Sequence, residues 1–88
     1  MKQIRLHRTF KKSFRSRIGN NPKIIKQFDD RVRMFSEGAR GYPLNDHALI
    51  GAMKMLRAFS VAGDIRIVYR ETEEYYEFLD IGSHNQVY

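Results

Sequence analysis

Cysteine is absent from the 88 residues, so neither a disulfide nor a cysteine-ligated zinc site can stabilise this chain. Small secreted domains commonly depend on disulfides, so this absence favours the reducing environment of a cytoplasm. No apolar run approaches the roughly 20 residues of a membrane span. Lys2, Arg5 and Arg8 also interrupt the stretch in which a signal peptide would need its apolar core. We therefore expect a cytoplasmic protein with no membrane partner.

Acidic residues are missing from positions 1–28, although the whole chain contains ten of them. Lysine and arginine recur along the same stretch, and the net charge of the chain is +6. A basic block of this kind predicts a polyanion or an acidic protein as partner. A solvated helix face is the alternative interpretation.

Cofactor motifs are missing as well. The chain contains no GxGxxG pattern, no P-loop glycines and no HExxH segment, so nucleotide cofactors and zincin-type metal sites have no support. The three histidines lie far apart in the sequence, and no serine lies on a strand-to-helix elbow. We expect neither a cofactor nor a metal.

The N-terminal half predicts one strand and two helices. Ile4 and Leu6 alternate with polar residues and indicate a strand over residues 2–8, with His7 on its solvated face. Thr9 is expected to cap a helix that ends at Gly19. After a turn, apolar residues at helical spacing predict a second helix over residues 22–37, with Pro22 at its first position.

The C-terminal half predicts three strands, over residues 53–61, 65–70 and 75–81, joined by short turns that favour antiparallel pairing. Together the elements indicate one domain over residues 1–88 in the α+β class. It consists of an N-terminal strand, a two-helix hairpin and a three-stranded antiparallel meander. The hairpin is expected to cover one sheet face with Phe10, Phe14, Phe28, Val32 and Phe35, and to leave the other face open.

Beyond the last predicted strand, His84 and the terminal Tyr88 lie where no later segment can cover them. We expect His84, His47, Arg57 and Arg66 to converge on one sheet face. Arginine offers two donors to a phosphate, and histidine exchanges protons near neutral pH. Such a set can cleave RNA without a metal, because the 2′-hydroxyl is itself the nucleophile and needs only a base, an acid and a cation.

Four segments carry a family resemblance. They are LNDHALIG at residues 44–51, RAFSV at 57–61, DIRIVY at 64–69 and DIGSHNQVY at 80–88. With them the chain resembles the RelE/ParE toxin superfamily over essentially its whole length, and is most similar to the YafQ-like and RelE/StbE branches. The D-H-x-L-x-G segment, the R-I-V-Y strand and the terminal G-S-H-x-x-V-Y are the most specific parts of this match.

The resemblance implies the toxin of a bacterial or archaeal type II toxin–antitoxin system, with a RelE-like fold. It also implies an mRNA endoribonuclease that cuts translated messages in the ribosomal A site and so inhibits translation. The partners implied are a cognate antitoxin, the ribosome and mRNA, with a toxin–antitoxin heterotetramer as one assembly.

Site residues follow from the same resemblance. Catalytic positions fall on His84 as general acid, on Arg66 as the cation at the scissile phosphate, and on the polar pair His47 and Asp64. Substrate-binding positions fall on Tyr88, which can stack on a base, and on Arg57 and Lys54. The resemblance also implies contacts to RNA or the ribosome that position the protein without reading the RNA sequence. They fall on Lys11, Lys12, Arg15 and Arg17. An acidic antitoxin segment that folds on binding would bind the same basic residues.

Two positions depart from the YafQ pattern. Ser60 stands where that pattern has a second histidine, and Ile65 stands where it has a tryptophan. A serine cannot act as a base near neutral pH, so His47 takes that role, or the rate is low, or the site works mainly by positioning. Two alternatives therefore stay open: a ParE-like non-catalytic inhibitor of DNA gyrase, and a catalytically weakened binding module.

Overall fold

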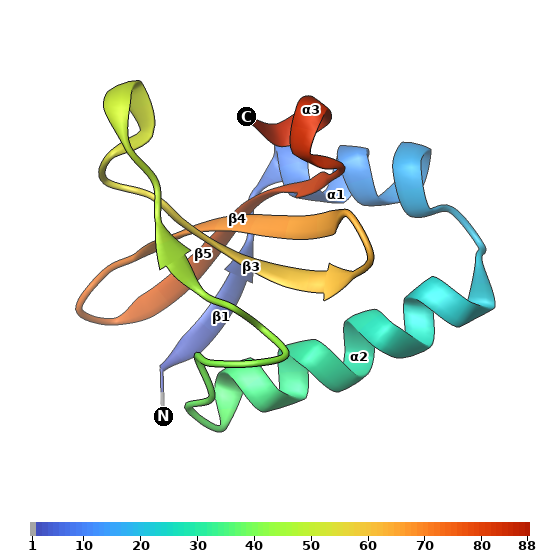
Figure 1. Cartoon of the computed structure of the whole chain (residues 1–88), viewed down its shortest axis with the longest axis horizontal. Coiled ribbons are helices and arrows are strands. Elements are labelled where there is room, and N and C mark those ends of the chain that lie inside the picture. Colours follow the sequence, from blue (N-terminus) through green and yellow to red (C-terminus); the bar gives the residue numbers. More distant parts are fainter. Residues whose placement is uncertain (1) are drawn as a thin grey trace.

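The computed structural model describes residues 2–88 as a five-stranded sheet with helices packed around it (Figure 1). In chain order the elements are β1 (Gln3–Leu6), α1 (Arg8–Ser13), the π-helix η1 (Phe14–Ile18), α2 (Pro22–Ser36), β2 (His47–Ala48), the 3-10 helix η2 (Gly51–Met53), β3 (Arg57–Ala62), β4 (Ile65–Glu71), β5 (Tyr75–Gly82) and α3 (His84–Val87). The predicted α+β fold is confirmed. Within residues 2–88, no helix is both long and apolar enough to cross a lipid bilayer.

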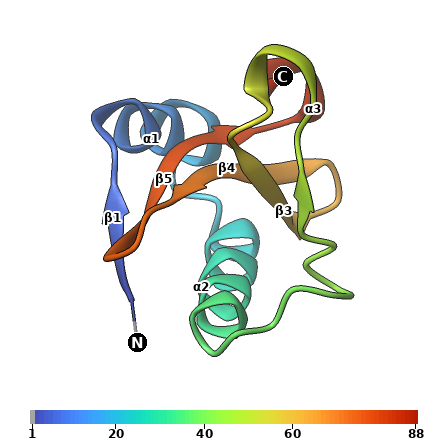
Figure 2. The same cartoon turned by 90° about the vertical axis from the view of Figure 1, so that its left-hand side faces the viewer.

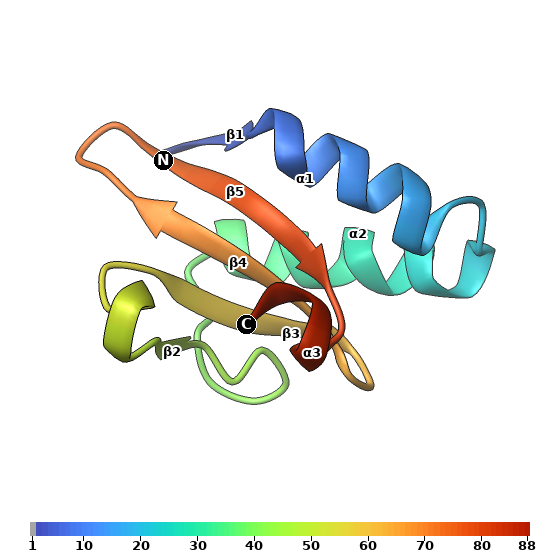
Figure 3. The same ribbon diagram turned by 90° about the horizontal axis from the view of Figure 1, so that it is seen from above.

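The sheet order is β1-β5-β4-β3-β2. The predicted antiparallel meander is confirmed for β3, β4 and β5. β1 lies on the far side of β5 and runs parallel to it, from Gln3 opposite Tyr75 to Leu6 opposite Phe78, as Figure 3 shows. The first and last strands of the chain are therefore neighbours, and the helices and the rest of the meander connect them.

The first helix begins two residues earlier than expected. His7, not Thr9, is the N-cap, and its Nδ1 accepts a hydrogen bond from the Thr9 backbone N–H at 3.0 Å. The predicted solvated histidine is exposed, but it lies one residue beyond β1 and not within the strand, and its imidazole nitrogen caps the helix as an Asn side chain does. α1 continues directly into η1, where the Gly19 N–H donates to the Phe14 carbonyl and ends the segment.

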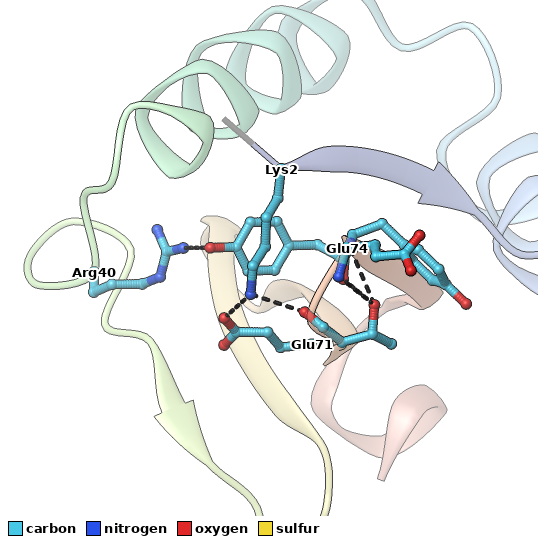
Figure 4. A network of polar contacts seen from close by, with 7 residues as sticks. Lys2, Arg40, Glu71 and Glu74 are labelled. Carbon is cyan, nitrogen blue, oxygen red and sulfur yellow. Dashed lines mark hydrogen bonds and ion pairs between the residues drawn. The ribbon is translucent and has the colours of Figure 1, made fainter.

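The start of α2 agrees with the sequence. The Asn21 side chain accepts from the backbone N–H groups of Lys23 and Ile24, and Pro22 occupies the first turn. At the other end Arg40 donates to the carbonyl of Phe35 at 2.8 Å and to the Tyr76 hydroxyl at 3.0 Å (Figure 4). These bonds satisfy a carbonyl at the helix end and attach it to β5.

A second group in Figure 4 attaches the start of β1. Lys2 Nζ lies 2.5 Å from Glu71 Oε2 and 2.8 Å from the Thr72 carbonyl, at the turn between β4 and β5. Glu71 therefore helps to hold β1 beside this turn.

Helix residues and sheet residues form one aromatic core. The Phe35 ring lies 4.7 Å from that of Phe59 and 4.8 Å from that of Tyr69, and Phe10 contacts Phe78 at 5.6 Å. Phe14, Phe28 and Val32 pack around this cluster and stay partly exposed. The expectation that the hairpin covers one sheet face with these residues is confirmed.

The opposite face is covered more than expected. Figures 1 and 2 show α3 on the side of the sheet away from α2. Ala58, Val68 and Val87 form a small buried cluster there, with Leu49 and Met53 packed against it. The prediction of an open face was wrong because the chain after Gly82 turns back into a helix, and because residues 51–53 form a 3-10 turn ahead of a strand that begins at Arg57 and not at Met53.

We predict that Phe35→Ala lowers the free energy of unfolding by about 3–5 kcal/mol, because it removes a fully buried ring from the centre of the core. Phe28→Ala removes the same side chain from a partly exposed position and should cost less than half as much. Urea denaturation followed by circular dichroism compares the two variants. Equal losses would contradict the placement of Phe35 at the centre of the core.

Candidate functional site

The ends of β4 and β5 bring three polar side chains together. Arg66 lies opposite Gly82 in the register of these strands. Its Nη2 contacts Asp64 Oδ1 at 3.1 Å, and its Nη1 contacts His84 Nδ1 at 3.2 Å. The His84 backbone N–H also donates to Asp64 Oδ2 at 3.3 Å. The predicted residues Asp64, Arg66 and His84 therefore form one cluster.

Local sequence places His84 at the start of α3. Ser83 is the N-cap of a capping box in which its backbone N–H donates to Gln86 Oε1 at 2.8 Å. Gly82 precedes it, and a Cβ there would lie 2.7 Å from that same oxygen and 2.8 Å from Arg17 Nη1. Only glycine lets both side chains approach the backbone this closely.

Tyr88 completes the cluster from the other end of α3. Its ring meets the His84 ring edge to face, with centroids 4.6 Å apart. The Arg66 guanidinium carbon lies 5.5 Å from the centre of the Tyr88 ring, within the range of a cation–π contact. The aromatic ring thus restricts the positions open to both His84 and Arg66.

His47 reaches the same region from β2, the edge strand beside β3. A cavity of about 240 Å³ is shared by His47, Asn45, Ser60 and Arg66, together with Phe59 and Gly63. A second hollow of about 370 Å³, mostly apolar, lies between His47 and Tyr88 and is floored by Leu49, Ile50 and Met53, with Ala48. His47 therefore stands between the two hollows.

The hydrogen-bond partners of the two histidines fix opposite tautomers. His84 Nδ1 faces Arg66, which can only donate, so Nδ1 is the acceptor and the ring proton of neutral His84 is on Nε2. His47 Nδ1 lies 3.0 Å from the Asn45 carbonyl, which can only accept. Neutral His47 therefore carries its proton on Nδ1 and leaves a lone pair on Nε2. Neutral His84 therefore presents an Nε2–H donor, and neutral His47 presents an Nε2 lone pair that can act as a base.

Arg57 does not join this cluster. It lies two and four residues before Phe59 and Val61 on β3, so it shares their face of the sheet, toward the helices. Its Nε and Nη2 each lie 2.7 Å from Asp46 Oδ1. The hydrogen bond to Asp46 is the main reason that the pKa of Arg57 is raised above its usual value. The prediction that Arg57 and Arg66 converge on one face of the sheet was wrong, because the alternation of side chains along the strands places them on opposite faces.

The remaining predicted residues lie apart from the site. Lys54 is exposed between η2 and β3. Lys11, Lys12 and Arg15 are exposed on α1 and η1. Arg17 is instead held by Asp80 Oδ1 at 3.2 Å and by the Ile81 carbonyl at 2.9 Å. Arg17 therefore has a structural role at the end of β5, and its contact with RNA or the ribosome stays a prediction.

Sequence reasoning missed two residues beside the site. Asn45, in the left-handed conformation with φ of 50°, supplies the carbonyl that meets His47. Asp46 supplies the buried carboxylate that holds Arg57. Both lie in the segment that carries the resemblance, but nothing in their spacing indicates which partner each one contacts. Across the described residues 2–88, histidine, aspartate and glutamate side chains form no group of three suited to a metal ion.

Comparisons with known proteins give a family model and several similar folds. A family model described as the bacterial toxin of a type II toxin–antitoxin system, YafQ, matches residues 2–88. No curated protein matches the chain significantly.

Among solved structures, YafQ from E. coli strain BL21(DE3) is similar with a TM-score of 0.82 at 18% identity, over 100% of this chain and 99% of that chain. YafQ in the E. coli DinJ-YafQ toxin–antitoxin complex also has a TM-score of 0.82 at 18% identity, over 99% and 97%. A YoeB/ParE toxin from Agrobacterium tumefaciens has a TM-score of 0.75 at 13% identity, over 93% and 98%. At these identities the likeness shows a shared fold.

Arg17→Gln should lower the free energy of unfolding by about 1–2 kcal/mol, because it removes a partly buried charged hydrogen bond to β5. Arg15→Gln, two positions away on the exposed surface, should change it by less than about 0.5 kcal/mol. Thermal and urea denaturation of both variants measure this difference. Equal stability of the two variants would contradict the structural assignment of Arg17.

Proposed function

Because the chain belongs to the YafQ family of bacterial type II toxin–antitoxin toxins, we propose that it is an endoribonuclease that cuts translated mRNA on the ribosome. The observation that carries the proposal is the arrangement around Arg66. This cation contacts His84 and Asp64 directly, and it shares a cavity with His47. A base, an acid and a cation for a phosphate therefore lie within one site, which is what transesterification of RNA requires.

In the proposed reaction His47 Nε2 removes the proton of the 2′-hydroxyl. The O2′ atom attacks the adjacent phosphorus, and Arg66 stabilises the charge that develops on the phosphate oxygens. His84 donates a proton to the 5′-oxygen as the P–O5′ bond breaks. The products are a 2′,3′-cyclic phosphate and a 5′-hydroxyl end.

Arg66 has to exchange one of its contacts during the proposed reaction. In the free protein one nitrogen of its guanidinium occupies His84 Nδ1 and another contacts Asp64. A bound phosphate competes with His84 for the Arg66 nitrogen that contacts His84 Nδ1. When the phosphate takes that nitrogen, His84 Nδ1 is free to accept a proton. Asp64 keeps the guanidinium oriented throughout, because its second oxygen is bonded to the backbone of α3.

The surfaces around the site suit the remaining partners. Tyr88 offers an exposed ring at the edge of the apolar hollow, where a neighbouring base can stack. Lys11, Lys12 and Arg15 offer charge to ribosomal RNA without reading its sequence. A YafQ from E. coli forms a complex with DinJ, and we infer that this chain likewise binds a cognate antitoxin in the bacterial cytoplasm.

We expect His84→Ala to slow cleavage by about 10²–10⁴-fold, because it removes the general acid. Arg66→Ala should slow it by about 10²–10³-fold, because the charge on the phosphate loses its stabilising donor. The measurement is primer extension on mRNA from a translation reaction. His7→Asn is the matched control, because it changes a histidine outside the site to another good helix cap.

Cuts that require translation and vanish in the His84 variant support the proposal. Cleavage by His84→Ala at the wild-type rate would remove His84 from the mechanism. If the wild-type protein arrests growth without cutting mRNA, the nuclease proposal fails. A gyrase supercoiling assay then separates an inhibitor of that enzyme from a binding module of another kind.

A further inference from the structure

A buried carboxylate lies behind the site, on the helix side of the sheet. The Asp46 side chain is fully buried, although it directly precedes His47. It accepts from Arg57 Nε and Nη2, both at 2.7 Å, and from the Tyr69 hydroxyl at 2.5 Å. We propose that Asp46, Arg57 and Tyr69 form a positioning clamp that holds His47 in the geometry of a base, an inference that rests on the proposed role of His47.

The clamp acts through the alternation of side chains along β2. His47 lies opposite Ala58, whose side chain is on the α3 face of the sheet, whereas Asp46 points to the helix side with Tyr69. Because neighbouring residues of an extended chain point to opposite faces, fixing Asp46 on one face fixes His47 on the other. β2 contains only His47 and Ala48, so ladder hydrogen bonds alone hold it weakly.

Tyr69 is a permanent donor to this carboxylate. Burial, followed by the hydrogen bond to Asp46, raises its pKa well above the usual 10, so the hydroxyl keeps its proton at any physiological pH. The ring packs between Phe35, Phe59 and Tyr76 in the main core. The position of the oxygen that meets Asp46 is therefore set by the packing of the main core.

The segment that the clamp fixes also sets the tautomer of His47. Asn45 precedes Asp46 and presents its carbonyl to His47 Nδ1. The backbone N–H of Asp46 donates to the Arg40 carbonyl at 2.8 Å, and the Ser60 N–H donates to the Leu44 carbonyl at 2.7 Å. If Asp46 leaves its pocket, the Asn45 carbonyl moves with it. His47 then loses the partner that keeps its Nε2 free for a substrate proton.

The experiment compares two tyrosines of the same core. Tyr69→Phe removes the hydroxyl that contacts the Asp46 carboxylate, whereas Tyr76→Phe removes a hydroxyl that contacts the Arg40 guanidinium and makes no contact with that carboxylate. Both variants keep their rings, so both should fold. We expect Tyr69→Phe to lower kcat by about 10- to 100-fold with KM unchanged, as a misplaced base would, and Tyr76→Phe to retain wild-type kcat.

The imidazole tautomers, measured by long-range ¹H–¹⁵N NMR, give a readout that needs no activity. In Tyr69→Phe the Nδ1–H tautomer of His47 should lose its dominance, while His84 keeps the wild-type spectrum. Arg57→Lys serves as a second clamp variant if Tyr69→Phe does not fold, because lysine keeps the charge but cannot make the two-nitrogen contact.

An unchanged His47 tautomer in both clamp variants would overturn the inference, and so would an equal loss of kcat in Tyr69→Phe and Tyr76→Phe. If the wild-type protein cuts no RNA but His47 changes tautomer in the clamp variants, the proposed function fails and the clamp stands. The two ideas are therefore tested separately.

Discussion

The packing of Phe35 against the sheet is the contact on which the rest of this structure depends. Its ring touches those of Phe59, Tyr69, Tyr76 and Phe78, and so joins α2 to three neighbouring strands. Because of this core, one face of the sheet is covered by the helices. Every strand residue that alternates with a core residue then has to point to the other face.

The position of the site follows from this division of the sheet into a helix-covered face and an opposite face. Arg66 lies between Ile65 and Ile67, which both pack in the helix-side core, and Ser60 lies between two more core residues. Arg66 and Ser60 therefore meet on the opposite face, where they share a cavity with His47. Tyr69 connects the two sides, because its ring belongs to the core and its hydroxyl holds the carboxylate next to His47.

Much of the fold could be predicted from local patterns. Periodic apolar residues and the Asn21-Pro22 cap place α2 almost to the residue, and short turns place the meander. The parallel pairing of β1 with β5 could not be predicted in this way, since these strands meet only after the whole chain has folded. α3 was missed for a different reason. Its four residues owe their helix to a capping box and to Val87 packing on the sheet, and such a short helix has no periodicity to detect.

The site shows the same division. His84, Arg66 and Asp64 were predicted together and lie together, because Asp64 and Arg66 flank the start of β4 and His84 follows the adjacent end of β5. Arg57 was placed with them in error. Its spacing from Arg66 does not reveal that a buried carboxylate on the other face holds it. The same carboxylate could not be identified from the sequence, because an aspartate in a polar loop is usually exposed.

The central claim is attack by the 2′-hydroxyl, with neutral His47 as the base and protonated His84 as the acid. The most direct test is cleavage of a translated message that carries a single 2′-deoxy sugar at the cut position. The account predicts that the deoxy message stays intact, and that the ribose message yields a 2′,3′-cyclic phosphate and a 5′-hydroxyl end. Cleavage of the deoxy message, or products with a 3′-hydroxyl and a 5′-phosphate, would contradict it.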